Sequence, residues 1–405
     1  MERRLTTLRE SLSDYRDDYS LCGKCKLCHA SHVHEIDRGR FWRNCPAGTR
    51  FRFDGYYASG RLEMARALEL GEIGPTPALL HSLYACTLCG NCQEQCYPVK
   101  QIHPLRVFEL MREKAVREGW GPLPEHRPAV DNLEKTDNLF GKPKRERETW
   151  SQGLGLGDAS RKGAEVLLFA GCRYSLQPEL ARTARAAVRV LQAAGYQLGS
   201  MGSEELCCGA PLLELGERDF FEAFAAENIR RIKAIGADLV ITLCPHCAWV
   251  MAEEYAPELG AELKPATEVV AEALREERFW PLHEVAGRAA WHDPCRLGRY
   301  LGLYDAPREI LDGIPALEVV EMERARGSTL CCGNGGMAGY AFPDYGEWAA
   351  AERVCEAEWV EAERLVTACP WCEEMLTRGA EARGSGVRVE NIFSLLARSL
   401  GGDEE

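Results

Sequence analysis

Two pairs of adjacent cysteines, Cys207–Cys208 and Cys331–Cys332, are the most unusual chemical feature of this sequence, and a glycine follows each pair. Neighbouring Cα atoms lie about 3.8 Å apart, which is shorter than the roughly 4.4–6.8 Å that a disulfide prefers. The paired thiols are therefore expected to face a common ligand. The chain has 19 cysteines, and in a cytoplasmic protein such density at regular spacing favours metal sites over disulfides.

Eight cysteines near the N-terminus follow the spacing of a two-cluster ferredoxin. A C-x2-C-x2-C-x3-C run begins at Cys86, and in such runs the fourth cysteine binds the other cluster. An earlier C-x2-C-x2-C run begins at Cys22, and its fourth cysteine, Cys45, which by the same rule binds the other cluster, follows after sixteen residues instead of three. This rule predicts two cubane [4Fe–4S] sites, formed by Cys22, Cys25, Cys28 and Cys96 and by Cys45, Cys86, Cys89 and Cys92. A zinc ribbon uses cysteines in pairs and leaves the third cysteine of each run unexplained.

An internal repeat positions the paired cysteines. The stretch "VLLFAGC", ending at Cys172, corresponds to "AAWHDPC", ending at Cys295, and "LCCG" and T-x-C-P-x-C recur in both copies. The successive intervals are 35 and 36 residues in the first copy and 36 and 37 in the second. Each copy is predicted to form strand, helix, strand, helix and strand, with its cysteines at the carboxyl ends of parallel strands. The two copies are expected to pack about a pseudo-twofold axis.

These elements divide the chain into four predicted parts. Residues 1–118 show helical periodicity with a break at Gly74-Pro75 and a helix beginning at Pro104. Residues 119–163 are predicted to be a linker with too few apolar residues for a core. The repeats occupy residues 164–285 and 286–405. The expected fold class is α+β and multidomain, with a mostly helical ferredoxin-like module followed by two tandem pseudo-symmetric α/β domains.

The complete repeats resemble the CCG-domain family of heterodisulfide reductase, and the preceding ferredoxin-like module is similar to the fused arrangement of its D-type subunit. In that family each set of five cysteines holds a noncubane [4Fe–4S] cluster. The resemblance implies two such clusters in this chain. It also explains why two cysteines are adjacent, because neighbouring sulfurs can reach neighbouring irons of one cluster. The implied ligands are Cys172, Cys207, Cys208, Cys244 and Cys247 for the first cluster and Cys295, Cys331, Cys332, Cys369 and Cys372 for the second.

Several other residues near these cysteines are candidates for binding or catalysis. Gly209 and Gly333 permit a sharp turn and a close approach to the cluster, and the run "GNGG" at 333–336 is interpreted as room for cluster or substrate. His292 is a candidate proton donor, and Arg296, with Arg173 and Arg299, is a candidate clamp for an anionic substrate; solvated arginines are the alternative.

The remaining histidines, one tryptophan and one cysteine near these motifs are not assigned as ligands. His246 and Trp371 lie between ligand positions and either tune a cluster or pack. Cys355 is expected to be a nonligand on a helix. The histidines His29, His32 and His34 are expected to be surface or packing residues.

Charge and composition restrict the partners. A formal net charge of −13 disfavours nucleic acid. The longest apolar stretches are far shorter than the roughly 20 residues of a transmembrane helix, and the N-terminus lacks a secretory signal, so we expect a cytoplasmic protein, associated with a membrane or a large soluble complex. The sequence has no flavin or nicotinamide motif. The expected partner in a hetero-oligomer is a flavoprotein that transfers electrons, similar to the A-type subunit of heterodisulfide reductase, or another redox protein.

Three functions from different classes fit these features. The first is a heterodisulfide reductase-like oxidoreductase subunit that passes electrons through the cubane clusters to or from the noncubane pair, with a disulfide as candidate substrate. The alternative is a purely electron-transfer subunit of a flavin-dependent hydroxyacid dehydrogenase or of a benzoyl-CoA reductase-type complex. A zinc-stabilised scaffold is the third. The complete cysteine sets favour the first.

Overall fold

The computed structural model describes residues 10–30 and 40–401, and its N-terminal part is helical. Pro104 begins the longest of these helices, and Gly74 and Pro75 fall between two others, as the sequence predicts. The only pairing of extended segments described there is one isolated bridge between Ala30 and Arg43. The helices are α1 (Arg16–Ser20), α2 (Pro46–Phe51), α3 (Ala58–Glu69), α4 (Pro77–Tyr84), α5 (Asn91–Lys100) and α6 (Pro104–Arg117).

The first repeat, together with β1 from the preceding segment 119–163, forms a five-stranded parallel sheet with the order β1-β3-β2-β4-β5. Its strands are β1 (Gly157–Asp158), β2 (Val166–Phe169), β3 (Leu198–Ser200), β4 (Leu239–Thr242) and β5 (Glu262–Pro265). The accompanying helices are α8 (Ala159–Lys162), α9 (Cys172–Leu176), α10 (Pro178–Ala193), α11 (Ala210–Leu215), α12 (Arg218–Ile235), α13 (Pro245–Val250), α14 (Ala256–Leu259) and α15 (Ala266–Arg275). A π-helical turn, Met251–Tyr255, joins α13 to α14.

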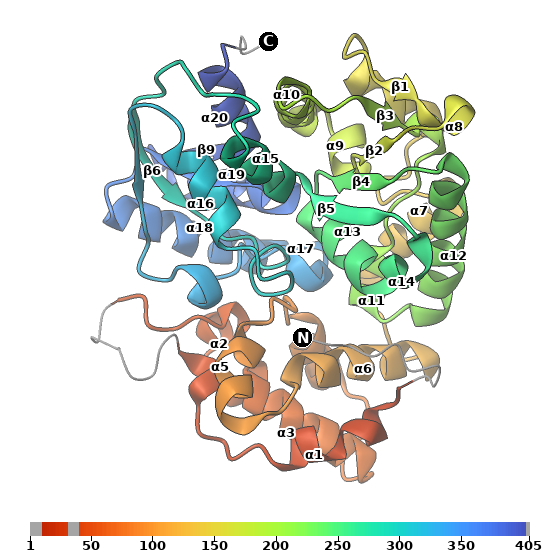
Figure 1. Ribbon diagram of the computed structural model, residues 1–405. Helices are drawn as coiled ribbons and strands as arrows, with labels where there is room; N and C mark the ends of the chain where they lie inside the picture. Colours follow the sequence, from red (N-terminus) through yellow and green to blue (C-terminus); the bar gives the residue numbers. More distant parts are fainter. Residues whose placement is uncertain (1–9, 31–39, 402–405) are drawn as a thin grey trace.

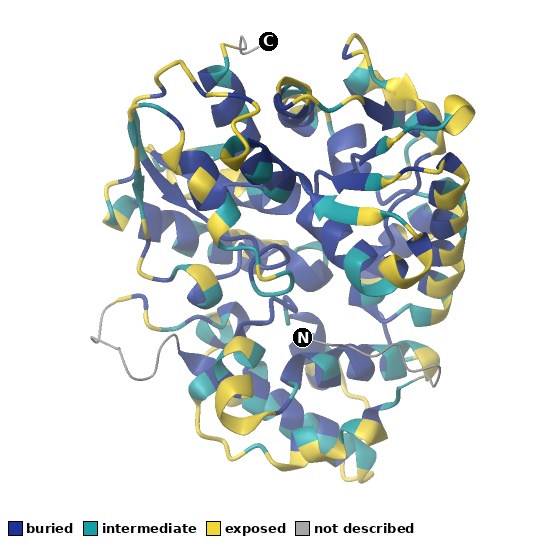
Figure 2. Ribbon diagram, in the orientation of Figure 1, coloured by how far each residue is buried: buried dark blue, intermediate teal, exposed yellow. Residues whose placement is uncertain are grey.

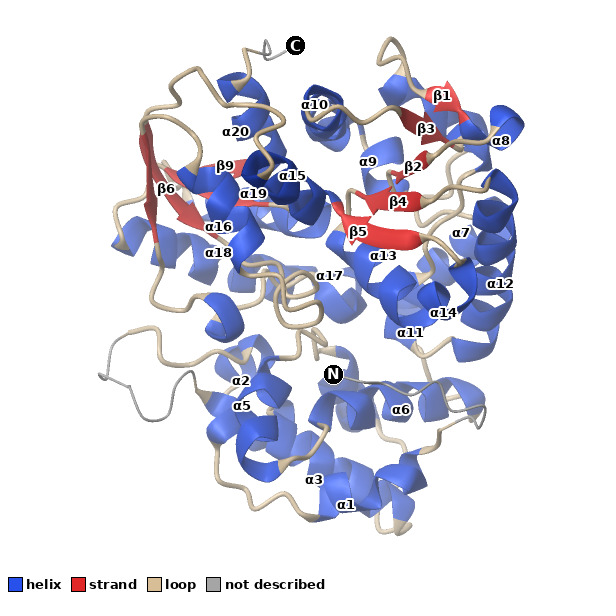
Figure 3. Ribbon diagram, viewed as in Figure 1, coloured by secondary structure: helices blue, strands red, loops and turns tan. Residues whose placement is uncertain are grey.

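The second repeat forms a four-stranded parallel sheet with the order β7-β6-β8-β9. Its strands are β6 (Gly287–Trp291), β7 (Leu317–Val320), β8 (Arg364–Thr367) and β9 (Arg388–Asn391), and its helices are α16 (Asp305–Asp312), α17 (Ala338–Ala341), α18 (Pro343–Trp359), α19 (Pro370–Arg383) and α20 (Ile392–Ser399). Figure 3 shows the described strands confined to these two sheets. The mixed helix and parallel-sheet architecture confirms the α+β class. Each repeat adds a fourth strand, β5 or β9, that the sequence pattern did not predict, and β1 at the edge of the first sheet comes from the segment predicted to be a linker.

The two repeats lie side by side above the helical N-terminal part (Figure 1). Their contacts are reciprocal, because α10 packs on α20 while α15 packs on α16. Each repeat thus places its first crossover helix against the last helix of the other, as expected for a twofold relation between them. An apolar core shared by the repeats fills this interface and contains Leu191, Val269, Ile310 and Leu396. The buried interior in Figure 2 also continues downward into a second core, which contains most of the cysteines.

Residues 119–163 differ from the linker predicted by the sequence. They contain α7 (Arg127–Thr136) and two 3-10 segments, Pro124–His126 and Lys144–Ser151. Trp150 and Leu154 are buried in the core shared by the repeats. Apolar residues too sparse to form a core of their own are sufficient to join a neighbouring one, which composition within the segment does not reveal. The domain boundaries themselves remain a prediction.

Within the described residues, no helix combines the length and the apolar character needed to cross a membrane.

Candidate metal centres

The eight N-terminal cysteines gather into the two groups that their spacing predicts. In one group, burial and the neighbouring thiols of Cys28, Cys22 and Cys25 raise the pKa of Cys96 to about 12. We call this group the outer set, because Cys25 is exposed to solvent. Cys96 lies on α5, four residues after the run that supplies the other group, so a single helix contributes to both.

The second group, Cys45, Cys86, Cys89 and Cys92, is called the inner set. Burial and the surrounding thiols raise the pKa of Cys92 well above its ordinary value. Cys45 precedes α2, whose first residue is a proline, and burial raises its pKa to about 12 although Arg61 opposes the shift. The long insert after Cys28 therefore still leaves Cys45 beside the other thiols.

The first CCG set lies at the carboxyl ends of β2, β3 and β4, where the repeat predicts it. Cys172 begins α9 directly after β2, and its Sγ atom lies 3.7 Å from that of Cys207. The thiol of Cys208 is hydrogen-bonded to Cys207 and to Cys247, and Cys247 contacts Cys244. All five thiols are buried, so the adjacent cysteines belong to one buried cluster of thiols.

The second CCG set repeats this arrangement. Cys331 contacts Cys295 and Cys332, and Cys332 contacts Cys372, which in turn contacts Cys369. Every member is again buried.

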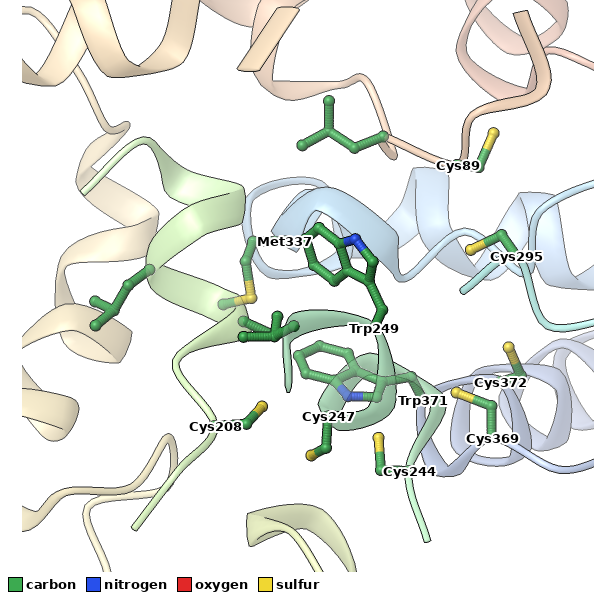
Figure 4. Packing of buried hydrophobic residues seen from close by; sticks show 14 of the residues in the cluster. Cys89, Cys208, Cys244, Cys247, Trp249, Cys295, Met337, Cys369, Trp371 and Cys372 are labelled. Carbon is green, nitrogen blue, oxygen red and sulfur yellow. The ribbon is translucent and has the colours of Figure 1, made fainter. Parts of the chain in front are cut away.

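Direct contacts join the cysteine sets in series. The thiol of Cys89, in the inner set, is hydrogen-bonded to Cys331 of the second CCG set. Cys369 of the second set contacts Cys244 of the first, and the Nδ1 atom of His246 lies 3.8 Å from the Cys369 sulfur. Figure 4 shows Cys244 next to Cys369, with Cys247 on the side of Cys244 that faces Cys208. The inner set is thus adjacent to the second CCG set, and the second CCG set is adjacent to the first.

Gly209 and Gly333 follow the paired cysteines with φ values of +79° and +95°, a region that L side chains rarely adopt. A Cβ atom at Gly333 would lie 2.4 Å from the carbonyl oxygen of Gly346, and one at Gly209 would lie 2.8 Å from the Phe221 ring. Each glycine therefore allows the chain to turn sharply beside its cysteine pair.

Gly335 and Gly336 allow a close approach of the loop that contains Cys86 and Thr87, not of a cluster or a substrate. A Cβ atom at either glycine would lie 2.5 Å from a carbonyl oxygen, that of Thr87 or that of Cys86. The space next to the "GNGG" run is occupied by the inner-set loop, because the second repeat packs directly on the N-terminal part. The interpretation as room for cluster or substrate is therefore wrong for these two positions.

The three arginines do not form a solvated face. Arg296 is 1% exposed and pairs with Glu214 at 2.6 Å between the rings of Trp249 and Tyr300. Arg296 thus belongs to the interior of the molecule, and a contact with substrate stays a prediction.

Its counterpart in the first repeat is also internal. Arg173 is 3% exposed, pairs with Glu374 and lies 3.7 Å from the centre of the Trp371 ring. Arg299 donates to the carbonyl oxygens of Cys89, Gly327 and Thr329.

His246 and Trp371 lie between the two CCG sets. Their rings stack at 4.9 Å, and His246 also lies 3.5 Å from the Glu214 carboxylate. Burial alone would lower the pKa of His246, but its contacts with Cys244, Cys369 and Glu214 raise it well above its ordinary value. Burial and Arg296 act in opposite directions on Glu214, and the net result is a pKa of about 2. The residues between the repeats thus form a buried charged network.

His292 faces the second CCG set. One side-chain atom each from His292, Cys332 and Cys372 lies within 4.8 Å of the others. Burial and Arg353 lower the pKa of His292 although the contact with Cys332 opposes the shift. Proton donation to a substrate by His292 stays a prediction.

Two residues that were not candidates lie away from these centres. His29 stacks on Tyr57 at 3.6 Å, which fits the packing function expected of it, while His32 and His34 lie outside the described residues. Cys355 lies on α18, as expected, and is buried.

Sequence reasoning missed Arg112, which joins the N-terminal part to both repeats. The Arg112 guanidinium donates to four carbonyl oxygens from all three parts: those of Leu83, Cys86, Glu214 and Gly336. Its position on an amphipathic helix resembles that of any surface arginine, so no local signal distinguishes it.

The four sets fit iron–sulfur clusters in their donor chemistry. Burial raises the pKa of inner- and outer-set thiols such as Cys45 and Cys96, so a cation is needed to favour the thiolate form that binds metal. Buried arginines close to the sulfurs, including Arg61 and Arg299, partly balance the negative charge that several thiolates would bring. A fifth thiol in each CCG set exceeds the four that a cubane takes.

The comparisons with known proteins agree with this chemistry. The family model described as "CCG: Cysteine-rich domain" matches twice, at residues 166–252 and 289–377. The chain is 30% identical to the D-type subunit of dihydromethanophenazine:CoB–CoM heterodisulfide reductase from Methanosarcina mazei, over 79% of this chain and 78% of that relative. These matches define an iron–sulfur oxidoreductase with two CCG domains.

Two other relatives are longer than this chain. It is 30% identical to the probable iron-sulfur-binding oxidoreductase FadF of Bacillus subtilis, over 85% of this chain and 50% of that protein. It is 29% identical to the EtfAB:quinone oxidoreductase of Syntrophomonas wolfei, over 79% of this chain and 46% of that protein. The chain therefore spans about half the length of these two relatives. It belongs to the CCG-domain family that includes the D-type subunit of heterodisulfide reductase.

Proposed function

We propose that this chain is a heterodisulfide reductase-like subunit of a larger redox complex that passes electrons through two cubane [4Fe–4S] clusters to or from two noncubane [4Fe–4S] clusters. The outer and inner sets would hold the cubane clusters, and the two CCG sets would hold the noncubane clusters. When bound, such clusters accept and release single electrons.

The contacts between cysteine sets are the observation that carries this proposal. Cys89 contacts Cys331, and Cys244 contacts Cys369. Cys28 of the outer set lies close enough to Cys92 of the inner set to help raise its pKa. The cysteines therefore support one order of centres: outer set, inner set, second CCG set, first CCG set. Because Cys25 is exposed, the outer set is suited to exchange electrons with a partner, for which we propose a flavoprotein or another redox protein.

A disulfide is the substrate that we propose for the two CCG sets. The complete five-cysteine sets and the relationship to the D-type subunit of heterodisulfide reductase support this choice. The alternative is a pure electron-transfer subunit, which the similarity to EtfAB:quinone oxidoreductase favours. In that case a partner would provide the substrate site, for example a flavin-dependent hydroxyacid dehydrogenase or a benzoyl-CoA reductase-type complex.

Anaerobic purification of the native protein tests the proposal. Iron analysis should give roughly sixteen atoms per chain, four for each of four clusters. Stepwise reduction followed by electron paramagnetic resonance should resolve two cubane and two noncubane signals. About eight iron atoms would contradict the two noncubane sites, and a colourless zinc protein would contradict the whole proposal. Turnover of a mixed disulfide by the copurified complex distinguishes the disulfide reductase from the electron-transfer subunit.

A further inference from the structure

The two CCG sets differ at the residue three positions before their first cysteine. This residue is Phe169 in the first repeat and His292 in the second. Both are buried and lie at the carboxyl ends of equivalent strands, β2 and β6. Phenylalanine carries no hydrogen-bond donor, whereas histidine carries one or two. At this position, therefore, only the second repeat has a polar side chain.

Neighbouring residues fix the His292 ring. Its backbone N–H donates to the carbonyl oxygen of Val366 at 2.8 Å, which ties His292 to strand β8. The Nε–H of Arg353 points to Nδ1 of the ring, with 3.2 Å between the two nitrogens. Arg353 is itself fixed, because it donates to the Glu356 carboxylate at 2.6 Å and to the carbonyl oxygen of Arg324 at 2.9 Å. This network is inaccessible to solvent, since both Arg353 and Glu356 are 0% exposed.

The hydrogen bond from Arg353 determines which ring nitrogen carries the proton. A guanidinium only donates, so Nδ1 of His292 must accept. In a neutral imidazole with an accepting Nδ1, the proton is on Nε2. A protonated Nε2 has no lone pair for a metal ion. His292 contacts the Cys332 thiol, and Nε2 is the nitrogen left to donate a hydrogen bond to that sulfur. In the same state Nε2 cannot coordinate iron.

We propose that His292 is a hydrogen-bond donor to the Cys332 sulfur, held in that state by Arg353, and that it raises the reduction potential of the second CCG centre relative to the first. A donated hydrogen bond withdraws negative charge from the sulfur and stabilises the reduced cluster. The second set is also the one in contact with the inner set through Cys89 and Cys331. The more easily reduced centre would thus be the first to exchange electrons with the N-terminal part.

This inference rests on the proposed cluster content, and substitutions at the two equivalent positions test it in the holoprotein. His292→Phe copies the residue of the first repeat and removes the donor. His292→Gln keeps an N–H close to the position of Nε2. Phe169→Leu is the matched control in the first repeat. Each variant is titrated under reducing potentials, with iron content and the paramagnetic resonance signals of both noncubane centres recorded.

We expect His292→Phe to keep its full iron content and to shift the midpoint potential of one noncubane centre downward, with the other unchanged. His292→Gln should restore most of the shift, and Phe169→Leu should move neither potential. A fully loaded His292→Phe protein with an unchanged potential would overturn the proposal.

If His292→Phe fails to assemble the second centre, nitrogen hyperfine spectroscopy of the wild-type protein tests whether His292 donates a hydrogen bond or binds iron directly. Weak coupling to an imidazole nitrogen supports a hydrogen bond, whereas strong coupling indicates a direct ligand and would overturn the proposal. Absence of noncubane signals from the wild-type protein is a different result, because it contradicts the cluster content proposed for the chain rather than the function of His292.

Discussion

The two CCG repeats share a topology but differ in what surrounds their cysteines. The second set contacts the inner set directly through Cys331, and His292 and Arg353 lie beside it. The first set is next to the second instead, and the position equivalent to His292 is occupied by Phe169. The two repeats thus hold similar sets of thiols, and the residues around these thiols differ. The expected difference is one of position in the electron path as well as of potential.

Substitution of one cysteine in either adjacent pair should have the largest effect. It should also show which of the two CCG sets comes first in the electron path. Cys332→Ser removes a thiol from the second set, so about four of roughly sixteen irons should be lost. Because the second set lies between the inner set and the first set, reduction of the first centre through the N-terminal clusters should also slow strongly. Rapid-freeze paramagnetic resonance after mixing with a low-potential donor measures this step.

The matched variant Cys208→Ser should lose a similar amount of iron from the first set. Its second centre should still be reduced as quickly as in the wild-type protein. Equal slowing of the remaining centre in both variants would contradict a serial path through the second set.

Two equivalent arginines, Arg296 and Arg173, each pair with a carboxylate, and removal of that carboxylate should lower the stability more at Arg296 than at Arg173. Glu214→Gln leaves Arg296 without its charged partner, and the side chains of both are 1% exposed. Breaking such a pair typically costs about 3–5 kcal/mol. Anaerobic chemical denaturation of the holoprotein measures the loss.

Glu374→Gln is the matched change at the equivalent arginine, because Glu374 pairs with Arg173. The Glu374 side chain is 19% exposed although that of Arg173 is only 3% exposed, so solvent screens this pair in part and a smaller loss than at Glu214 is expected. A loss at Glu374 as large as that at Glu214 would show that burial does not distinguish the two pairs.

The spacing of the cysteines was sufficient to predict most of this arrangement, whereas contacts between distant segments were not. Spacing located the thiols at the carboxyl ends of parallel strands, because a repeated strand and helix pattern has few possible topologies. It carried no information about Cys89 meeting Cys331, or about Arg112 binding carbonyl groups from three parts of the chain. Such contacts depend on how domains dock. The packing of Trp150 was not predicted for a similar reason, because its segment has few apolar residues and its contacts are with the core shared by the repeats.

An alanine at each of the two glycines should also distinguish the repeats. Gly333→Ala imposes a left-handed backbone on an L residue, at a cost of about 1–2 kcal/mol, and places its Cβ against the main chain of Gly346. Main chain moves less readily than a side chain, so the second centre should be distorted. At Gly209 the obstacle is the Phe221 ring, which can shift. Thermal unfolding of the two holoproteins should therefore show the lower midpoint for Gly333→Ala, and the reverse order would contradict this reasoning.

Cys355 should give the smallest effect, although it is buried in the second repeat. The equivalent position in the first repeat is Arg230, which is exposed on α12, so the two helices are covered differently. Cys355 contacts no member of the four cysteine sets in the hydrogen bonds described for the chain, and burial raises its pKa. Cys355→Ala should retain roughly sixteen irons and lose about 1 kcal/mol of stability through packing alone. Iron analysis checks this prediction, since a loss of about four irons would mean that Cys355 replaces one of the ligands proposed for the second set.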